Sequence, residues 1–140
     1  MRLSRTAILS VAALGCTMVG ELKGLVTLQR RLAAEYHTNA ISVNINNAVH
    51  LTVTFANSPM GQLPEDEREG AARGVATFVL GHYPRADTLR TITVAFSSRT
   101  SAGPLTITRG GNAYRFAPAE LRAALQAGQK AAADSSAVRR

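Results

Sequence analysis

Apolar and polar residues alternate with two different periods in the first half of the chain. Over residues 21–36, apolar side chains recur every three or four positions, which predicts an amphipathic helix. The period then changes to two, over 41–46 and again over 49–55, which predicts two strands. Asn46 and Asn47 lie between these runs, and asparagine tolerates the positive φ of a tight turn. We therefore expect a β-hairpin with one apolar and one polar face.

The second half of the chain carries a further helix pattern followed by strand patterns. Acidic residues at 65–67 follow Pro64, as is favoured at a helix N-terminus, and Pro84 ends the predicted helix. Alternation over residues 88–98 predicts a strand. Further along, the stretch "RGGN" at 109–112 predicts a turn that joins two short strands.

A third helix is predicted from Pro118, and the final "DSSAVRR" shows no periodicity. The order is therefore α-β-β-α-β-β-β-α, with each strand polar on one face. This pattern predicts the α+β class, with an antiparallel sheet of about five strands and helices packed on one face. We expect a single domain over residues 21–128 and a disordered C-terminal tail over 129–140.

Composition limits the kind of partner. At 140 residues, with 46% hydrophobic and 18% charged residues, the chain has the length and make-up of one folded domain. The net charge of +7 is typical of nucleic-acid-binding proteins, but Arg2, Arg5, Arg139 and Arg140 lie at the two ends of the chain. Between them, no stripe of basic residues with interleaved aromatics is present. We expect a basic solvated surface and no nucleic-acid partner, with attraction to anionic lipid headgroups left open.

The first sixteen residues, "MRLSRTAILSVAALGC", have the pattern of an export signal. A basic start is followed by an apolar run over 7–15 and then by Cys16, the single cysteine of the chain. That run is shorter than the roughly 20 apolar residues needed to cross a bilayer. We therefore predict a signal peptide over residues 1–15.

The junction "AALGC" resembles the bacterial lipobox, whose cysteine receives a diacylglyceryl group and becomes the new N-terminus. Gly15 matches that pattern, whereas the two residues before it depart from the usual order. The resemblance implies that Cys16 carries fatty acyl chains such as palmitate and that residues 16–20 form a short tether. Thr17, in place of Asp, resembles the pattern for transfer to the outer membrane, facing the periplasm. Ordinary cleavage and retention of the segment are the alternatives.

Candidate catalytic chemistry centres on His50, on a predicted strand among threonine and asparagine residues. Nucleophilic catalysis needs a hydroxyl or thiol held by the histidine and a third group that orients it, and no nucleophile-elbow pattern is present. His37 and His82 stand at helix ends, without the spacing of a metal site. We therefore predict no catalytic residue, no metal and no cofactor, and a protein that is not an enzyme.

The polar face of the predicted sheet is the remaining candidate site. Threonine is favoured on strands because β-branched residues fit a pleated surface, so solvation alone explains part of it. Hydroxyl and amide groups on such a face also supply hydrogen bonds to a docked partner. The predicted partner-binding face comprises Asn44, His50, Thr52, Thr54, Thr91, Thr93 and Arg115.

The stretch from "INNAVHLTVTFANSP" to "TITVAF" looks like small uncharacterised lipoproteins of bacterial envelopes, and the α-β-β-α-β core is similar to BON domains without their glycine pattern. The resemblance implies a non-enzymatic, membrane-anchored envelope lipoprotein that acts as a binding or accessory subunit of an envelope complex. The alternative is a small hydrolase or ligand-carrier domain that uses His50 with Asn44 or Asn57. A concave pocket with a hydroxyl at His50 favours that alternative, and a flat sheet favours partner binding.

Overall fold

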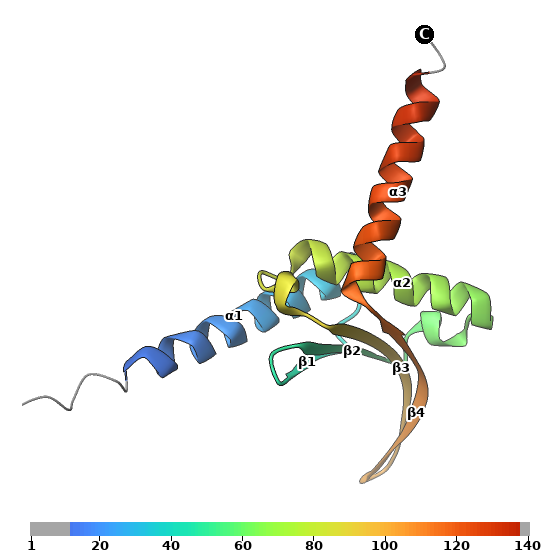
Figure 1. Cartoon of the computed structure of the whole chain (residues 1–140). Helices are drawn as coiled ribbons and strands as arrows, with labels where there is room; N and C mark the ends of the chain where they lie inside the picture. The colour runs from blue at the N-terminus through green and yellow to red at the C-terminus, as the bar shows by residue number, and fades with distance from the viewer. Residues whose placement is uncertain (1–11, 138–140) are drawn as a thin grey trace, which may run out of the picture.

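The computed structural model of the chain describes residues 12–137 (Figure 1). Most of the predicted signal peptide, residues 1–11, lies outside this range, as do residues 138–140. In chain order the elements are α1 (Ala12–Glu35), β1 (Ile41–Asn46), β2 (His50–Ala56), η1 (Pro59–Gln62), α2 (Glu65–His82), η2 (Ala86–Thr88), β3 (Thr91–Ala102), β4 (Leu105–Phe116) and α3 (Pro118–Ala137). Within the described range, none of the helices combines the length and hydropathy that a bilayer span requires.

The four strands form one mixed sheet in the order β1-β2-β3-β4. β1 with β2 and β3 with β4 are antiparallel pairs, whereas β2 and β3 run parallel. The predicted α+β class is confirmed, but the prediction of about five antiparallel strands is wrong. The parallel pair arises because α2 lies between β2 and β3 in the chain and returns it to the same end of the sheet.

The fifth predicted strand disappears because residues 109–112 are not a turn. β3 and β4 turn at Gly103, whose φ is +61°, and Pro104. The two glycines at 110 and 111 lie inside β4, where the pairing with β3 is irregular. Between the pairs Ala95–Ala113 and Ser97–Gly110, β3 has one residue, Phe96, and β4 has two. There a Cβ on Gly111 would lie 1.8 Å from the carbonyl oxygen of Phe96. Glycine at 111 therefore permits the close approach of two strands in a β-bulge.

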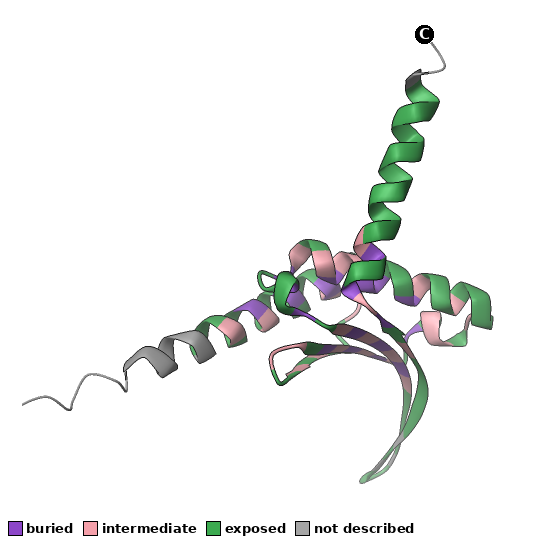
Figure 2. Cartoon of the chain, in the orientation of Figure 1, coloured by how far each residue is buried: buried purple, intermediate pink, exposed green. Residues whose placement is uncertain are grey.

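One hydrophobic cluster fills the space between the helices and one face of the sheet (Figure 2). Seven of the eight inward residues predicted for the two central strands are buried: Leu51, Val53, Phe55, Leu89, Ile92, Val94 and Phe96. The eighth, Val49, lies in the turn before β2 and is only partly buried. The predicted stripe of the first helix is confirmed only in part. Leu28 and Leu32 are buried, but Leu22 is 64% exposed, because the N-terminal half of α1 projects past the sheet (Figure 1). Val26 is 41% exposed, because it precedes Leu28 by two residues and therefore lies on the opposite side of the helix.

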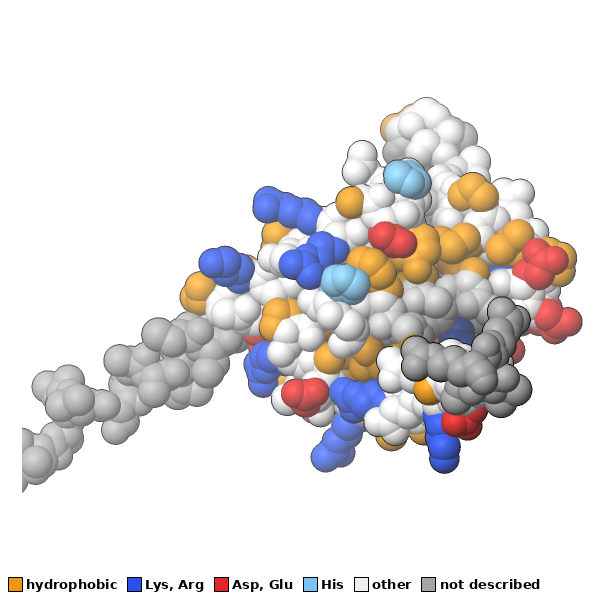
Figure 3. All heavy atoms as spheres, turned by 90° about the horizontal axis from the view of Figure 1, so that it is seen from above, with side chains coloured by type: hydrophobic (Ala, Val, Ile, Leu, Met, Phe, Trp, Pro, Cys, Tyr) orange, Lys and Arg blue, Asp and Glu red, His pale blue; other side chains and the backbone are white. Residues whose placement is uncertain are grey.

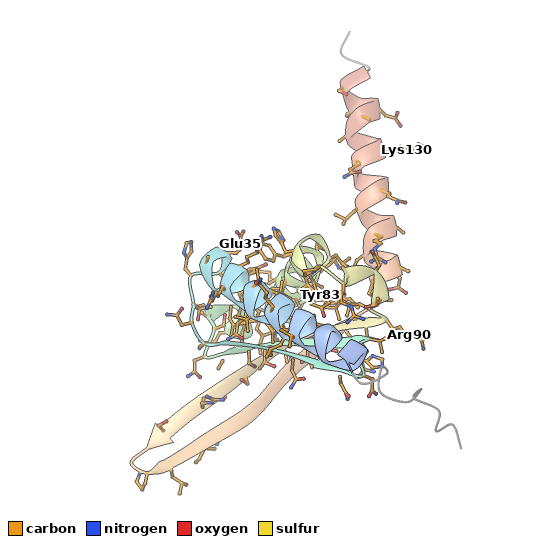
Figure 4. All side chains as sticks on the ribbon, turned by 90° about the vertical axis from the view of Figure 1, so that its left-hand side faces the viewer. Glu35, Tyr83, Arg90 and Lys130 are labelled. Atoms are coloured by element: carbon orange, nitrogen blue, oxygen red, sulfur yellow. The ribbon has the colours of Figure 1, made fainter. Side chains whose placement is uncertain are left out.

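Both terminal helices are longer than the sequence pattern predicts. α1 continues through residues 16–20, which were predicted to be a tether. α3 continues to Ala137, so the predicted disordered tail over 129–140 is helical as far as that residue. Lys130 lies on the part of α3 that stands clear of the body (Figure 4). The alanine-rich sequence explains this helix, since alanine has the highest intrinsic helix propensity.

Candidate functional site

The face of the sheet that is turned away from the hydrophobic cluster, here called the open face, carries the predicted partner-binding residues in two rows. In the first row, His50 pairs with Asn46 on β1 and with Thr91 on β3. In the second row, Thr52 lies between Asn44 and Thr93, and Thr93 pairs with Arg115 on β4. Strict alternation along each strand directs these side chains to the same face.

Together these two rows line a hollow of ≈ 320 Å³ in the open face. Its residues are Asn44, Asn46, His50, Thr52, Thr91, Thr93 and Arg115. The structure thus brings together six of the seven residues predicted for the partner-binding face. Thr54 is the exception, because it lines a neighbouring hollow of ≈ 190 Å³ with Ser42 and Arg99. Asn46 was missed because it was assigned to the turn, although its alternation with Asn44 places it on the same face.

The hollow is rich in hydrogen-bond donors. Each of its seven lining side chains carries at least one N–H or O–H group or, for His50, a ring nitrogen that can hold a proton. Among the described residues, no hydrogen bond or ion pair engages any of these side chains. The four strands contain no Asp or Glu, and their aromatic residues (Phe55, Phe96, Tyr114 and Phe116) occupy the register positions of the helix-covered face.

A hollow with threonine hydroxyls at His50 is the feature that favours the hydrolase alternative, so its geometry matters. A catalytic histidine must be hydrogen-bonded to its nucleophile and oriented by a third group. In the described part of the chain, His50 has no such bond, and the strands supply no carboxylate to orient it. The described residues therefore give His50 neither a held nucleophile nor an orienting group.

Asn57, which the hydrolase alternative also invokes, is hydrogen-bonded to the backbone of β3. Its φ is +54°, and its side-chain amide donates to the carbonyl oxygen of Arg99 at 3.0 Å and accepts from the Arg99 N–H at 2.6 Å. The side-chain amide of Asn57 thereby makes, just after the end of β2, the two hydrogen bonds to β3 that the backbone of a further β2 residue would make. Beyond it, β3 and β4 continue as a two-stranded ribbon that extends away from the helices (Figure 4).

The other candidates from the sequence have structural roles. His82 Nδ1 lies 2.9 Å from the carbonyl oxygen of Phe78, and its ring stacks on the Phe78 ring. Glu65 accepts a hydrogen bond from Tyr114 at 2.8 Å and pairs with Arg68 at 2.8 Å, so it ties the start of α2 to β4. Within residues 12–137, no group of three or more His, Cys, Asp or Glu side chains could hold a metal ion.

Comparison of the chain with protein-family models, with curated proteins and with solved structures found no match. The hollow therefore has to be interpreted from its own chemistry. The predicted lipidation of Cys16 concerns a side chain that lies outside those the structure describes.

Proposed function

We propose that the chain is a non-catalytic, membrane-anchored binding domain of the bacterial envelope, with the open face as its binding surface. One observation carries this proposal: hydrogen-bond donors from all four strands meet in a hollow on the face turned away from the hydrophobic cluster. Such donors in a concave surface fix the orientation of a bound group, which is the usual role of polar residues in a ligand site.

The lipobox-like junction before Cys16 supports the membrane anchor. A second support is the outer side of α1, where Val19, Leu22 and Val26 are 69%, 64% and 41% exposed. Spacings of three and four residues place these side chains on one stripe of the helix, a few residues after Cys16. Exposed apolar residues immediately after an acylated N-terminus would lie at the boundary between lipid and water.

Site-specific cross-linking tests the binding surface. We expect a photoreactive amino acid at Thr93 to form an adduct in native membranes, because Thr93 lines the hollow. The same amino acid at Glu67, an exposed residue of α2, is the matched control and should form none. Equal adducts from both positions would contradict the proposal. Failure to form an adduct, together with substrate turnover by the purified protein, would favour an enzyme.

Metabolic labelling with a clickable fatty acid tests the anchor separately. The wild-type chain should incorporate the label and sediment with membranes, since two or three acyl chains bind membranes stably. Cys16→Ser should lose the label and leave the membrane fraction. Equal labelling of the two proteins would disprove the lipid anchor and leave the binding surface unaffected.

A further inference from the structure

The donors of the hollow point to the chemical class of its ligand. An ionised phosphate oxygen accepts hydrogen bonds and donates none. The hollow presents donors from seven side chains, and no carboxylate is among them. We infer that the hollow binds a phosphate group, carried either by a small soluble molecule or by a lipid headgroup. This inference rests on the proposed function and names the ligand of the same surface.

The distribution of charge over the fold favours an anion at this face. All nine acidic residues of the chain lie in helical segments: Glu21, Glu35, Glu65, Asp66, Glu67, Glu69, Asp87, Glu120 and Asp134. Acidic and basic side chains lie close together on the face seen from above (Figure 3). The strands contain three arginines, Arg99, Arg109 and Arg115, and no Asp or Glu, so no acidic side chain of the sheet repels a bound anion or competes with it for an arginine.

Arg115 is the one arginine or lysine among the described residues that line the hollow. Four arginines of the helical layer, by contrast, are neutralised by carboxylates: Arg68, Arg73, Arg85 and Arg122. Among the described residues, Arg115 has no carboxylate partner, and it is exposed in the hollow opposite Thr93. Its planar guanidinium can donate two parallel hydrogen bonds to one phosphate group.

The remaining side chains restrict the ligand further. The Phe and Tyr residues of the strands all occupy the helix-covered face, so the hollow lacks the row of aromatic rings on which successive bases of a single-stranded nucleic acid stack. Its volume of ≈ 320 Å³ lies at the lower end of the range for small-molecule sites. Asparagine amides from β1 and threonine hydroxyls from β2 and β3 suit the several oxygens of a phosphate better than the two oxygens of a carboxylate.

A titration of the isotope-labelled full chain with inorganic phosphate, at constant pH and ionic strength, tests the inference through backbone amide shifts. We expect saturable shifts centred on His50, Thr93 and Arg115. Arg115→Gln should weaken phosphate binding at least about tenfold, because the charge-assisted hydrogen bonds are lost. An unchanged amide spectrum elsewhere verifies that this variant folds.

Arg109→Gln is the matched control. It removes the same charge from the same strand, but Arg109 pairs with Ser98 and belongs to the opposite face. Its phosphate affinity should change by less than about twofold, because a distant exposed charge is screened by salt. If inorganic phosphate binds, equal weakening in both variants would mean that overall charge rather than the hollow explains the binding. Weakening in neither variant would mean that Arg115 does not hold the bound phosphate. Either result would overturn the inference.

A second arm distinguishes the two sources of the phosphate group. The same three proteins, each also carrying Cys16→Ser so that no acyl chain is attached, are sedimented with vesicles of phosphatidylcholine alone and of phosphatidylcholine with phosphatidylglycerol. Sedimentation that requires phosphatidylglycerol and Arg115, without a response to inorganic phosphate, assigns the group to a lipid headgroup. A response to inorganic phosphate without such sedimentation assigns it to a soluble molecule. If neither arm depends on Arg115 while Thr93 still forms its cross-link, the phosphate inference fails and the binding surface stands.

Discussion

Gly111→Ala tests the β-bulge that positions Arg115. A Cβ at this residue would lie 1.8 Å from the carbonyl oxygen of Phe96 and 2.8 Å from its carbonyl carbon, whereas Cβ contacts below 3.0 Å are essentially never seen. The obstacle is backbone, so no rotation of a side chain can relieve the overlap. The two strands must separate by more than about 1 Å for the methyl group to fit.

The expected cost follows from this displacement. Overpacking of a tight site costs about 1 to 3 kcal/mol, and each hydrogen bond lost from the ladder beside the bulge adds about 1 kcal/mol. With two such bonds lost, we expect Gly111→Ala to lower the free energy of unfolding by about 3 to 5 kcal/mol. For a domain of this kind the whole stability is about 5 to 15 kcal/mol.

The adjacent glycine provides the control. A Cβ on Gly110 meets no atom within 4 Å, and its φ is not in the left-handed region. Gly110→Ala should therefore stay within about 0.5 kcal/mol or gain up to about 1 kcal/mol from the reduced entropy of the unfolded chain. Urea unfolding of both variants, followed by circular dichroism, measures the difference. If Gly111→Ala were as stable as Gly110→Ala, the bulge would not have the close approach described above.

Three further substitutions test the core, the open face and the buried tyrosine. Phe55→Ala should cost about 3 to 5 kcal/mol in urea unfolding, because Phe55 is fully buried against the rings of Tyr36 and Phe96, whereas His50→Ala on the open face should stay within about 0.5 kcal/mol. A larger cost for His50→Ala than for Phe55→Ala would mean that the faces of β2 are reversed. Tyr83→Phe should raise the free energy of unfolding by about 1 kcal/mol, because the Tyr83 hydroxyl is buried without a hydrogen-bond partner. Burial, with Glu21 nearby, raises the pKa of Tyr83 above 10.0, so the unfolded chain loses this proton first and stability falls as pH rises past that value. Thermal melts at about pH 8 and about pH 11 should show a smaller alkaline loss in Tyr83→Phe than in the wild type, and a larger one would refute this assignment.

The sequence by itself determined which residues face the core and which face the solvent on the central strands. Side chains alternate along a strand for purely local reasons, so the period of two identified Leu51, Val53 and Phe55 as core residues before any pairing was known. The same period placed His50 and Thr52 on the polar face, and the helix signals at Pro64 and Pro118 were equally local.

Other features depended on which segments meet in space. β2 and β3 pair in parallel because α2 returns the chain to the same end of the sheet. The alternation within each strand carries no information about that return path. A pair of glycines between two strand-like runs can form either a turn or a bulge. The close approach of the Phe96 backbone to Gly111 shows that Gly110 and Gly111 belong to a bulge. The helix period of α1 could not indicate that Leu22 is exposed, because burial depends on where the sheet ends.

The candidate site combines both kinds of information. The alternation along each strand predicted that four residues lie on a polar face: Asn44, Thr52, Thr93 and Arg115. It did not predict how far apart they lie. The register of three strand pairs brings them into one row. The bulge at Gly111 then sets the face that each half of β4 presents, so that Arg115 lies on the open face and Arg109 on the other. An extra residue on one strand reverses the alternation beyond it, and only the pairing of β4 with β3 reveals where that happens.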